Sequence, residues 1–324
     1  MHDAICITTP SRLHFGLLRF GQDRGPSYGG LGMMLAKPRI AVELQKSDQW
    51  HVAGPMADRA LAYARNVLQK WQLPRFTAFD IRVLEAPLSH AGLGSGTQLA
   101  LAVAYGIRSV TELPACKISE LVDAVGRGRR SAVGSHGFDQ GGILWETGYQ
   151  PGQSLSPLAC RMSVPDVWRV LLITPNHPPG LHGASEATAF DRLPPISEEI
   201  ACQLERLAED QVLPAIEQVD FDRFAASIFQ YGHLAGRSFS SIQGGPYASP
   251  QIAACIDRLR HIGIQGVGQS SWGPTIFAFC MNQDAAEELA ERLPQFEEFT
   301  GANLSITPPD NQGAAIERIP DFVT

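Results

Sequence analysis

Three glycines at alternate positions stand directly before an apolar stretch, in HAGLGSGTQLALAVA at residues 90–104. Glycines let backbone amides approach a ligand closely, and the first amides of a helix attract negative charge. The stretch is neither a Walker loop nor a G-x-G-x-x-G motif, and a plain tight turn before a helix is the alternative interpretation. The residues that we expect to bind an anion are Gly92, Gly94, Ser95, Gly96, Thr97 and Gln98.

Two more segments carry groups that could face the same ligand. GVGQSSWGPT, residues 266–275, places Ser270 and Ser271 between two expected strands. A β-turn whose polar residues bind nothing would have the same sequence pattern. In SRLHFGLL, the alternation of a strand puts Arg12 and His14 on one face and large apolar side chains on the other. An exposed sheet face is the alternative for this pair.

Arginines and an acid lie close together in GRGRRSAVGSHGFDQGG, residues 126–142. Arg129 and Arg130 suit bidentate recognition of phosphate or carboxylate. Asp139 has two interpretations that the sequence leaves open: a structural ion pair, or a group that binds a metal ion and acts as a base.

Hydrophobic periodicity and turn signals predict alternating strands and helices around these segments. The helix after the glycines is apolar on nearly all sides, so we expect it to be buried. The glycine-rich residues 21–35 are expected to form a loop. We predict an α+β fold of two domains, residues 1–164 and 165–324, with mixed sheets, helices packed on them and a cleft between the domains. Expected strands are 4–20, 40–44, 79–85, 142–146 and 167–175, and expected helices are 57–71, 117–127, 197–213, 220–237 and 250–262.

Composition describes an ordinary globular chain of 324 residues, with 44% hydrophobic and 18% charged residues. A net charge of -7 disfavours nonspecific binding of nucleic acid, which requires a basic surface. No apolar run reaches the roughly 20 residues that span a bilayer, and the opening MHDAICITTP lacks the pattern of a leader, so we expect a cytoplasmic protein without a membrane partner. The six cysteines lie far apart, which argues against zinc and disulfides.

The order of the glycine loops resembles the GHMP superfamily of small-molecule kinases, in which P-x-x-x-G-L-G-S-S precedes a buried helix. Here Pro87 stands one residue farther out, and Gly96 replaces the second serine, which in the kinases helps to hold the nucleotide phosphates and magnesium. The ordered set SRLHFGL, GGLGM, GLGSGTQLALA, GRGRRS and SSWGPT is more specifically similar to the β-ribofuranosylaminobenzene 5'-phosphate synthase family.

This resemblance implies a phosphoribosyltransferase that opens the tetrahydromethanopterin pathway. Phosphoribosyl diphosphate would react with 4-aminobenzoate, or with 4-hydroxybenzoate in some members, and would lose diphosphate and carbon dioxide as a carbon-carbon bond forms. Magnesium is expected with the diphosphate, and a homodimer is compatible with analogy to the family.

The resemblance also suggests roles for individual residues. Asp139 occupies the place of the acidic residue of the kinases, so it would bind magnesium or the ribose hydroxyls. Arg12 and His14 would lie near the benzoate carboxylate or a phosphate, and these two residues and Asp139 are the candidate catalytic residues. The candidate substrate-binding residues beyond the glycine loop are Arg129, Arg130, Ser270 and Ser271.

Two alternatives belong to other functional classes. A GHMP kinase that phosphorylates a small molecule would use ATP, but Gly96 and the SRLHFGL opening argue against it. A non-catalytic metabolite sensor on the same fold would be favoured by degraded glycine loops or a lost acid, whereas these loops and Asp139 are present. A further departure is Arg19, because archaeal members of the family tend to carry an acidic residue shortly after the R-L-H motif.

Overall fold

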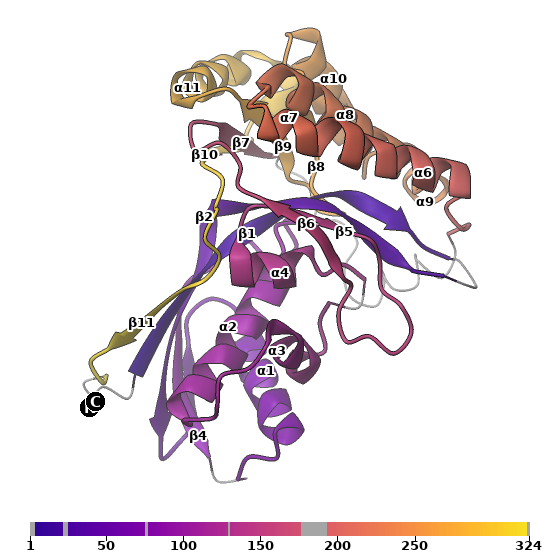
Figure 1. Cartoon of the computed structure of the whole chain (residues 1–324). Helices are drawn as coiled ribbons and strands as arrows, with labels where there is room; N and C mark the ends of the chain where they lie inside the picture. The colour runs from indigo at the N-terminus through magenta and orange to yellow at the C-terminus, as the bar shows by residue number, and fades with distance from the viewer. Residues whose placement is uncertain (1–3, 22–24, 75–76, 129, 176–192, 323–324) are drawn as a thin grey trace.

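The computed structural model describes residues 4–21, 25–74, 77–128, 130–175 and 193–322. Two sheets with helices packed on them make up this part of the chain (Figure 1), which confirms the predicted α+β class. Within the described ranges, no helix combines the length and the apolar character needed to cross a bilayer.

The larger sheet has seven strands in the order β11-β1-β2-β4-β3, and β5 and β6 continue it from β2. Its pairs are antiparallel except for β3 with β4. The strands are β1 (Ala4–Arg19), β2 (Tyr28–Ser47), β3 (His51–Ala53), β4 (Ala78–Glu85), β5 (Ile143–Glu146), β6 (Leu158–Met162) and β11 (Ala315–Ile319).

The second strand begins earlier than the sequence predicted. Residues 28–35 were expected to lie in a glycine-rich loop, but they form the first part of β2 and pair with β1. Gly30 has a φ of 140° and packs directly against the backbone of Gly16, so only a glycine fits there. Pairing with β1 therefore outweighs the low strand preference of glycine.

Helices cover one face of the large sheet (Figure 1). They are α1 (Ala57–Lys70), α2 (Ser95–Val110), α3 (Ile118–Val125) and α4 (Val133–Gln140). As predicted, α2 is buried on nearly all sides, and every residue from Leu99 to Ala104 is fully buried. Close packing around α2 holds the preceding glycine turn in one position.

The smaller sheet has the order β10-β7-β9-β8 and has helices on both faces. Aromatic contacts join it to the large sheet: the ring of Phe15 on β1 meets that of Phe277 on β9 edge to face at 5.3 Å and lies 6.1 Å from that of Phe279. One apolar cluster thus extends from the large sheet into the second half. The elements of this half are β7 (Arg169–Thr174), β8 (Val267–Gln269), β9 (Ile276–Cys280), β10 (Asn303–Thr307), α6 (Glu198–Arg206), α7 (Leu213–Glu217), α8 (Phe221–Arg237), α9 (Ser240–Gln243), α10 (Pro250–His261) and α11 (Gln283–Arg292).

Two expectations about the second half need correction. The last strand, β11, returns to the large sheet and pairs with β1, so residues 165–324 do not form one separate unit. The single helix expected over 197–213 is divided into α6, a π-helical segment η1 (Leu207–Val212) and α7. Pro214 has no N–H to donate, which is a physical reason for the change of helical pitch just before it.

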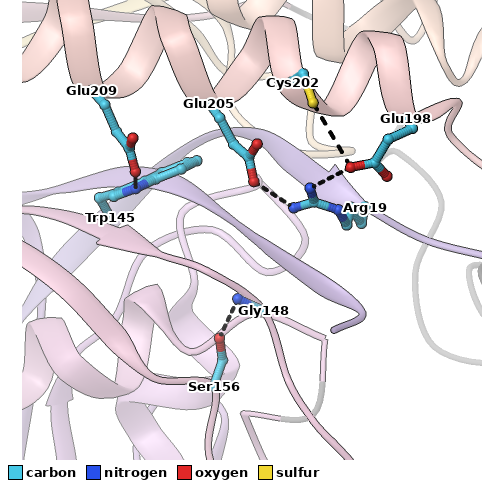
Figure 2. A network of polar contacts seen from close by, with 8 residues as sticks. All are labelled: Arg19, Trp145, Gly148, Ser156, Glu198, Cys202, Glu205 and Glu209. Atoms are coloured by element: carbon cyan, nitrogen blue, oxygen red, sulfur yellow. Dashed lines mark hydrogen bonds and ion pairs between the residues drawn. The ribbon is translucent and has the colours of Figure 1, made fainter. Parts of the chain in front are cut away.

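Polar contacts join this helical segment to the large sheet (Figure 2). Arg19, at the end of β1, pairs with Glu205 at 2.8 Å and with Glu198 at 3.3 Å. On η1, Glu209 accepts a hydrogen bond from the indole N–H of Trp145 at 3.1 Å. Arg19 therefore has a structural role, because it links the end of β1 to α6.

Candidate functional site

The glycine turn ends where α2 begins, as predicted. Gly92 and Gly94 have φ values of 86° and 73°, which other residues rarely adopt. The first backbone bonds of the helix run from Thr97 and Gln98 to the Gly94 carbonyl. The amides of Ser95 and Gly96 precede these bonds and lie at the positive end of the helix dipole.

Two arginines from other elements lie beside this turn. Arg59 on α1 donates a hydrogen bond to the hydroxyl of Tyr63 at 3.2 Å, and Arg127 donates to the same hydroxyl. Any side chain at Gly96 would collide with the Arg59 guanidinium, so glycine at this position leaves room for a positive charge. The Arg12 Nε lies 3.2 Å from where a Cβ on Gly94 would stand, which brings a third guanidinium to the turn.

Ser270 links the loop at residues 270–273 to the glycine turn by hydrogen bonds. Its hydroxyl donates to the Gly92 carbonyl at 2.8 Å and accepts from the His14 amide at 3.2 Å. The amide of Ser271 donates to the His14 carbonyl at 3.1 Å. Three segments far apart in the sequence, at residues 12–14, 92–97 and 270–273, are thereby held together.

Two adjoining cavities open at this junction. The arginine cavity has a volume of about 460 Å³ and is lined by Arg12, Arg59, Arg127 and the glycine turn. The aromatic cavity has a volume of about 370 Å³ and includes Phe239, Trp272 and Tyr247 in its wall. Residues that line both cavities are Arg12, Thr97, Arg127, Ser271 and Trp272.

A buried carboxyl group lies behind the aromatic cavity. Glu146, at the end of β5, is fully buried and accepts hydrogen bonds from the Ser131 hydroxyl at 2.8 Å and from the Ala132 amide at 2.8 and 3.0 Å. Burial raises the pKa of Glu146 to about 7, although these hydrogen bonds oppose the rise. Ser131 and His14 separate this carboxyl group from the cavity.

Most of the predicted site residues meet at these cavities. The five residues from Gly92 to Thr97 that we named line the arginine cavity, while Arg12, His14, Arg130 and Ser271 line the aromatic cavity. Arg129 lies outside the described residues.

Three predicted residues have positions that differ from the expectation. Gln98 is fully buried and donates to the Gly134 carbonyl at 2.7 Å, and Ser270 is fully buried between two backbones, so both shape the site without lining a cavity. Asp139 is exposed at the end of α4 and lines neither cavity, whereas Ser131, just before this helix, lines the aromatic cavity.

Arg59, Tyr63, Ser131 and Glu146 were missed by the sequence analysis. Arg59 and Tyr63 lie one turn apart on α1, a spacing compatible with a shared contact, but nothing in the sequence says that α1 faces the glycines. Glu146 ends the apolar run ILWE, and an acid at a buried strand position is a signal that could have identified it.

Cation-binding groups are sparse around the two cavities. Among the residues that the structure describes, no three His, Cys, Asp or Glu side chains are grouped so that they could hold a metal ion. Glu146 is already engaged by a hydroxyl and an amide. The donor set therefore does not fit a magnesium ion held by the protein alone.

Comparison with known proteins agrees with this fold. Residues 212–298 match the family model described as GHMP kinases C terminal. The structure of a homoserine kinase from Cytophaga hutchinsonii superimposes with a TM-score of 0.65 and 17% identity over 98% of both chains. That of mevalonate pyrophosphate decarboxylase from Streptococcus pyogenes gives a TM-score of 0.69 at 13% identity, again over 98% of both chains.

Proteins that are similar in sequence identify a narrower group than the fold does. Beta-ribofuranosylphenol 5'-phosphate synthase of Methanothermobacter thermautotrophicus is 29% identical over 85% of this chain and 88% of its own. The protein of the same name from Archaeoglobus fulgidus is 27% identical over 96% of this chain and 99% of its own. Over most of its length the chain is therefore a homologue of these synthases, and its residues 212–298 match a GHMP kinase C-terminal domain, which confirms the predicted resemblance.

Proposed function

We propose that this chain is a phosphoribosyltransferase that joins phosphoribosyl diphosphate to 4-hydroxybenzoate or 4-aminobenzoate, with loss of diphosphate and carbon dioxide. The names of the homologous synthases support a ribosyl phosphate product on an aromatic ring. The observation that carries the proposal is a cavity with three arginines that adjoins a cavity with aromatic walls.

The arginine cavity suits the diphosphate. Arg12, Arg59 and Arg127 supply positive charge, and the first amides of α2 supply oriented donors. Departure of diphosphate from the anomeric carbon breaks the carbon-oxygen bond and leaves both electrons on the leaving group. Donors fixed before the reaction stabilise that developing charge without reorganising.

The aromatic cavity suits the benzoate. Phe239 and Trp272 meet edge to face, with ring centroids 5.0 Å apart, and form an apolar wall for a third ring. Arg130 and Arg12 lie on the same cavity and can attract a carboxylate. In this arrangement the ring lies beside the ribose and the diphosphate lies at the glycine turn.

The reaction then follows from where the electrons go. The ring carbon that bears the carboxylate attacks the anomeric carbon as the diphosphate leaves. The bond from this ring carbon to the carboxylate breaks next, carbon dioxide departs, and the electron pair restores the aromatic ring. No proton has to be removed from that carbon.

Magnesium belongs to this proposal as part of the substrate. Since the described side chains do not form a carboxylate site, the ion would enter bound to the diphosphate, and the arginines would hold the complex. A cytoplasmic location, a homodimer and the absence of a nucleic-acid partner belong to the same proposal.

The test is release of labelled carbon dioxide from the carboxyl group of each acid, with magnesium and with either phosphoribosyl diphosphate or ATP. We expect release that requires phosphoribosyl diphosphate. No release from either acid would contradict the proposal; binding and turnover of ATP would then favour a kinase, and ligand binding without turnover would favour a sensor.

A further inference from the structure

A line of hydrogen bonds runs from the aromatic cavity to the interior. The imidazole Nε2 of His14 lies 3.1 Å from the Ser131 hydroxyl, which donates to Glu146 at 2.8 Å. His14 and Ser131 both line the cavity, whereas Glu146 is fully buried. The proposed transfer of the ribosyl group gives this buried acid no role.

Packing fixes all three side chains in this line. The amide of Val133 donates to the Ser131 hydroxyl at 3.3 Å, and the amide of Ala132 donates to both oxygens of Glu146. A backbone irregularity in the pairing of β1 with β2 lies between His14 and Gly16, where a bulge can redirect a side chain. Burying the Glu146 carboxyl group costs free energy of desolvation that an apolar residue would not cost. A purely structural role would therefore not require an acid at this position.

The titratable groups near Glu146 lie on β1 and α8, and two serines lie in the adjoining loops. His14 on β1 is held neutral, because burial and the charge of Arg12 lower its pKa well below the ordinary value. Tyr231 on α8 has its pKa raised, mainly by burial and further by the charge of Glu146. Ser131 and Ser156 offer hydroxyls alone. The pKa of Glu146 itself is raised to about 7, so its carboxyl group can exchange a proton near neutral pH.

We propose that Ser131 and Glu146 accept the phenolic proton of the aromatic substrate, and so select a ring with a hydroxyl over a ring with an amine opposite the carboxylate. This inference rests on the proposed function. Ser131 contacts the substrate, and Glu146 acts through it as a positioning and proton-holding residue. His14 holds the Ser131 oxygen from the other side.

The proton transfer balances within one turnover. As the ring attacks the anomeric carbon, the phenolic O–H bond breaks, its proton passes to Ser131, and the Ser131 proton passes to Glu146. The oxygen electrons enter the ring, which becomes a dienone bearing both the ribose and the carboxylate. Loss of carbon dioxide returns an electron pair to the ring and oxygen, and the oxygen regains its proton by the reverse path. An amine can supply its lone pair without losing a proton first.

The test compares two acids in one variant. Glu146→Gln keeps the size of the side chain but cannot accept a proton. We expect kcat for carbon dioxide release to fall about 100-fold with 4-hydroxybenzoate, a typical share for general acid-base catalysis, and to stay essentially unchanged with 4-aminobenzoate. Ser131→Ala should show the same selective loss, and Ser131→Thr, which keeps a hydroxyl, should restore turnover.

A matched control is Glu209→Gln, which removes a carboxylate that bonds to the neighbouring Trp145 but faces neither cavity. It should leave both rates unchanged. As a second measurement, 3,5-difluoro-4-hydroxybenzoate has a more acidic phenol, so the ratio of wild-type to Glu146→Gln rates should be much smaller for this acid than for 4-hydroxybenzoate.

Equal losses with every acid, or no loss with 4-hydroxybenzoate, would overturn the inference and leave the synthase activity standing. Turnover of 4-aminobenzoate alone by the wild type would also overturn it. The proposed function fails in a different way, namely if the wild type releases carbon dioxide from none of these acids.

Discussion

Arg59 and Arg127 share one hydroxyl group, that of Tyr63, and this contact aims two guanidiniums at the glycine turn. Replacing Arg59 with alanine removes one charged donor from the arginine cavity. Hydrogen bonds to charged groups contribute about 1.5–3 kcal/mol, so we predict that KM for phosphoribosyl diphosphate rises by roughly 10-fold or more. Steady-state kinetics measures this change.

The matched control is Arg65→Ala, which removes an exposed arginine from the same helix. Its KM should equal that of the wild type. Equal effects of the two substitutions would show that general charge, and not the position of Arg59, attracts the substrate.

Because the pKa of Glu146 is raised, we predict that the free energy of unfolding depends on pH even when no substrate is present. Its pKa is about 7 in the folded chain, above the ordinary value of 4.5, so the folded state favours the protonated form. This contribution is fully present below pH 4.5 and is lost as the pH rises through 7. The free energy of unfolding should fall by roughly 3 kcal/mol relative to that of Glu146→Gln across this window. Urea unfolding at several pH values measures it, and parallel curves for the two proteins would contradict the raised pKa.

The site residues that could be predicted from the sequence are those whose conformation depends on their neighbours along the chain. Gly92 and Gly94 could be identified because a turn before a helix requires their conformations. Arg59 and Glu146 could not, because their partners lie far away in the sequence and only the packed sheet and helices bring them together. Asp139 lies on a segment that reaches the site at Ser131, but its own side chain is exposed and lines neither cavity.

At the element scale, α2 and the turn before it act as one unit. Gly96 lies in the first turn of α2, and a methyl group there would displace the flexible end of Arg59. We predict that Gly96→Ala leaves the free energy of unfolding unchanged or slightly higher, since alanine favours helices by up to about 1 kcal/mol over glycine. KM for phosphoribosyl diphosphate should nevertheless rise.

Combining Gly96→Ala with Arg59→Ala tests the cause. Because both changes remove the same guanidinium contact, their effects on KM should be less than additive. Fully additive effects would show that the methyl group acts on the substrate in another way.

Element types followed from periodicity, as in the nearly all-apolar α2, but two boundaries depended on distant partners. Residues 28–35 extend β2 because β1 lies beside them, and the π-helical turn of η1 precedes a proline that has no N–H to donate. Glycine content alone could not distinguish a loop from a strand whose neighbour approaches closely.

At the scale of the whole molecule, Arg19 connects the large sheet to the helices of the second half (Figure 2). Its side chain is 11% exposed, and it pairs with Glu205 and Glu198. Arg19→Met should lower the free energy of unfolding by about 1–3 kcal/mol, because it removes a nearly buried charge from two carboxylates. Urea denaturation measures the change.

The exposed pair of Arg39 with Glu85 provides the comparison, since both side chains are nearly half exposed. Arg39→Met should cost less than about 1 kcal/mol. If the two substitutions cost the same, Arg19 does not join the halves as described. Neither this contact nor the return of β11 to the large sheet could be predicted, because both connect segments that are distant in the sequence.

In the proposed reaction, one pair of cavities couples departure of diphosphate to loss of carbon dioxide. The most direct test measures both products in the same reaction of phosphoribosyl diphosphate with carboxyl-labelled 4-hydroxybenzoate. We expect equal molar amounts of diphosphate and carbon dioxide throughout the time course. Diphosphate released without carbon dioxide would contradict the proposed reaction, because the arginine cavity would then serve a hydrolysis that does not involve the aromatic acid.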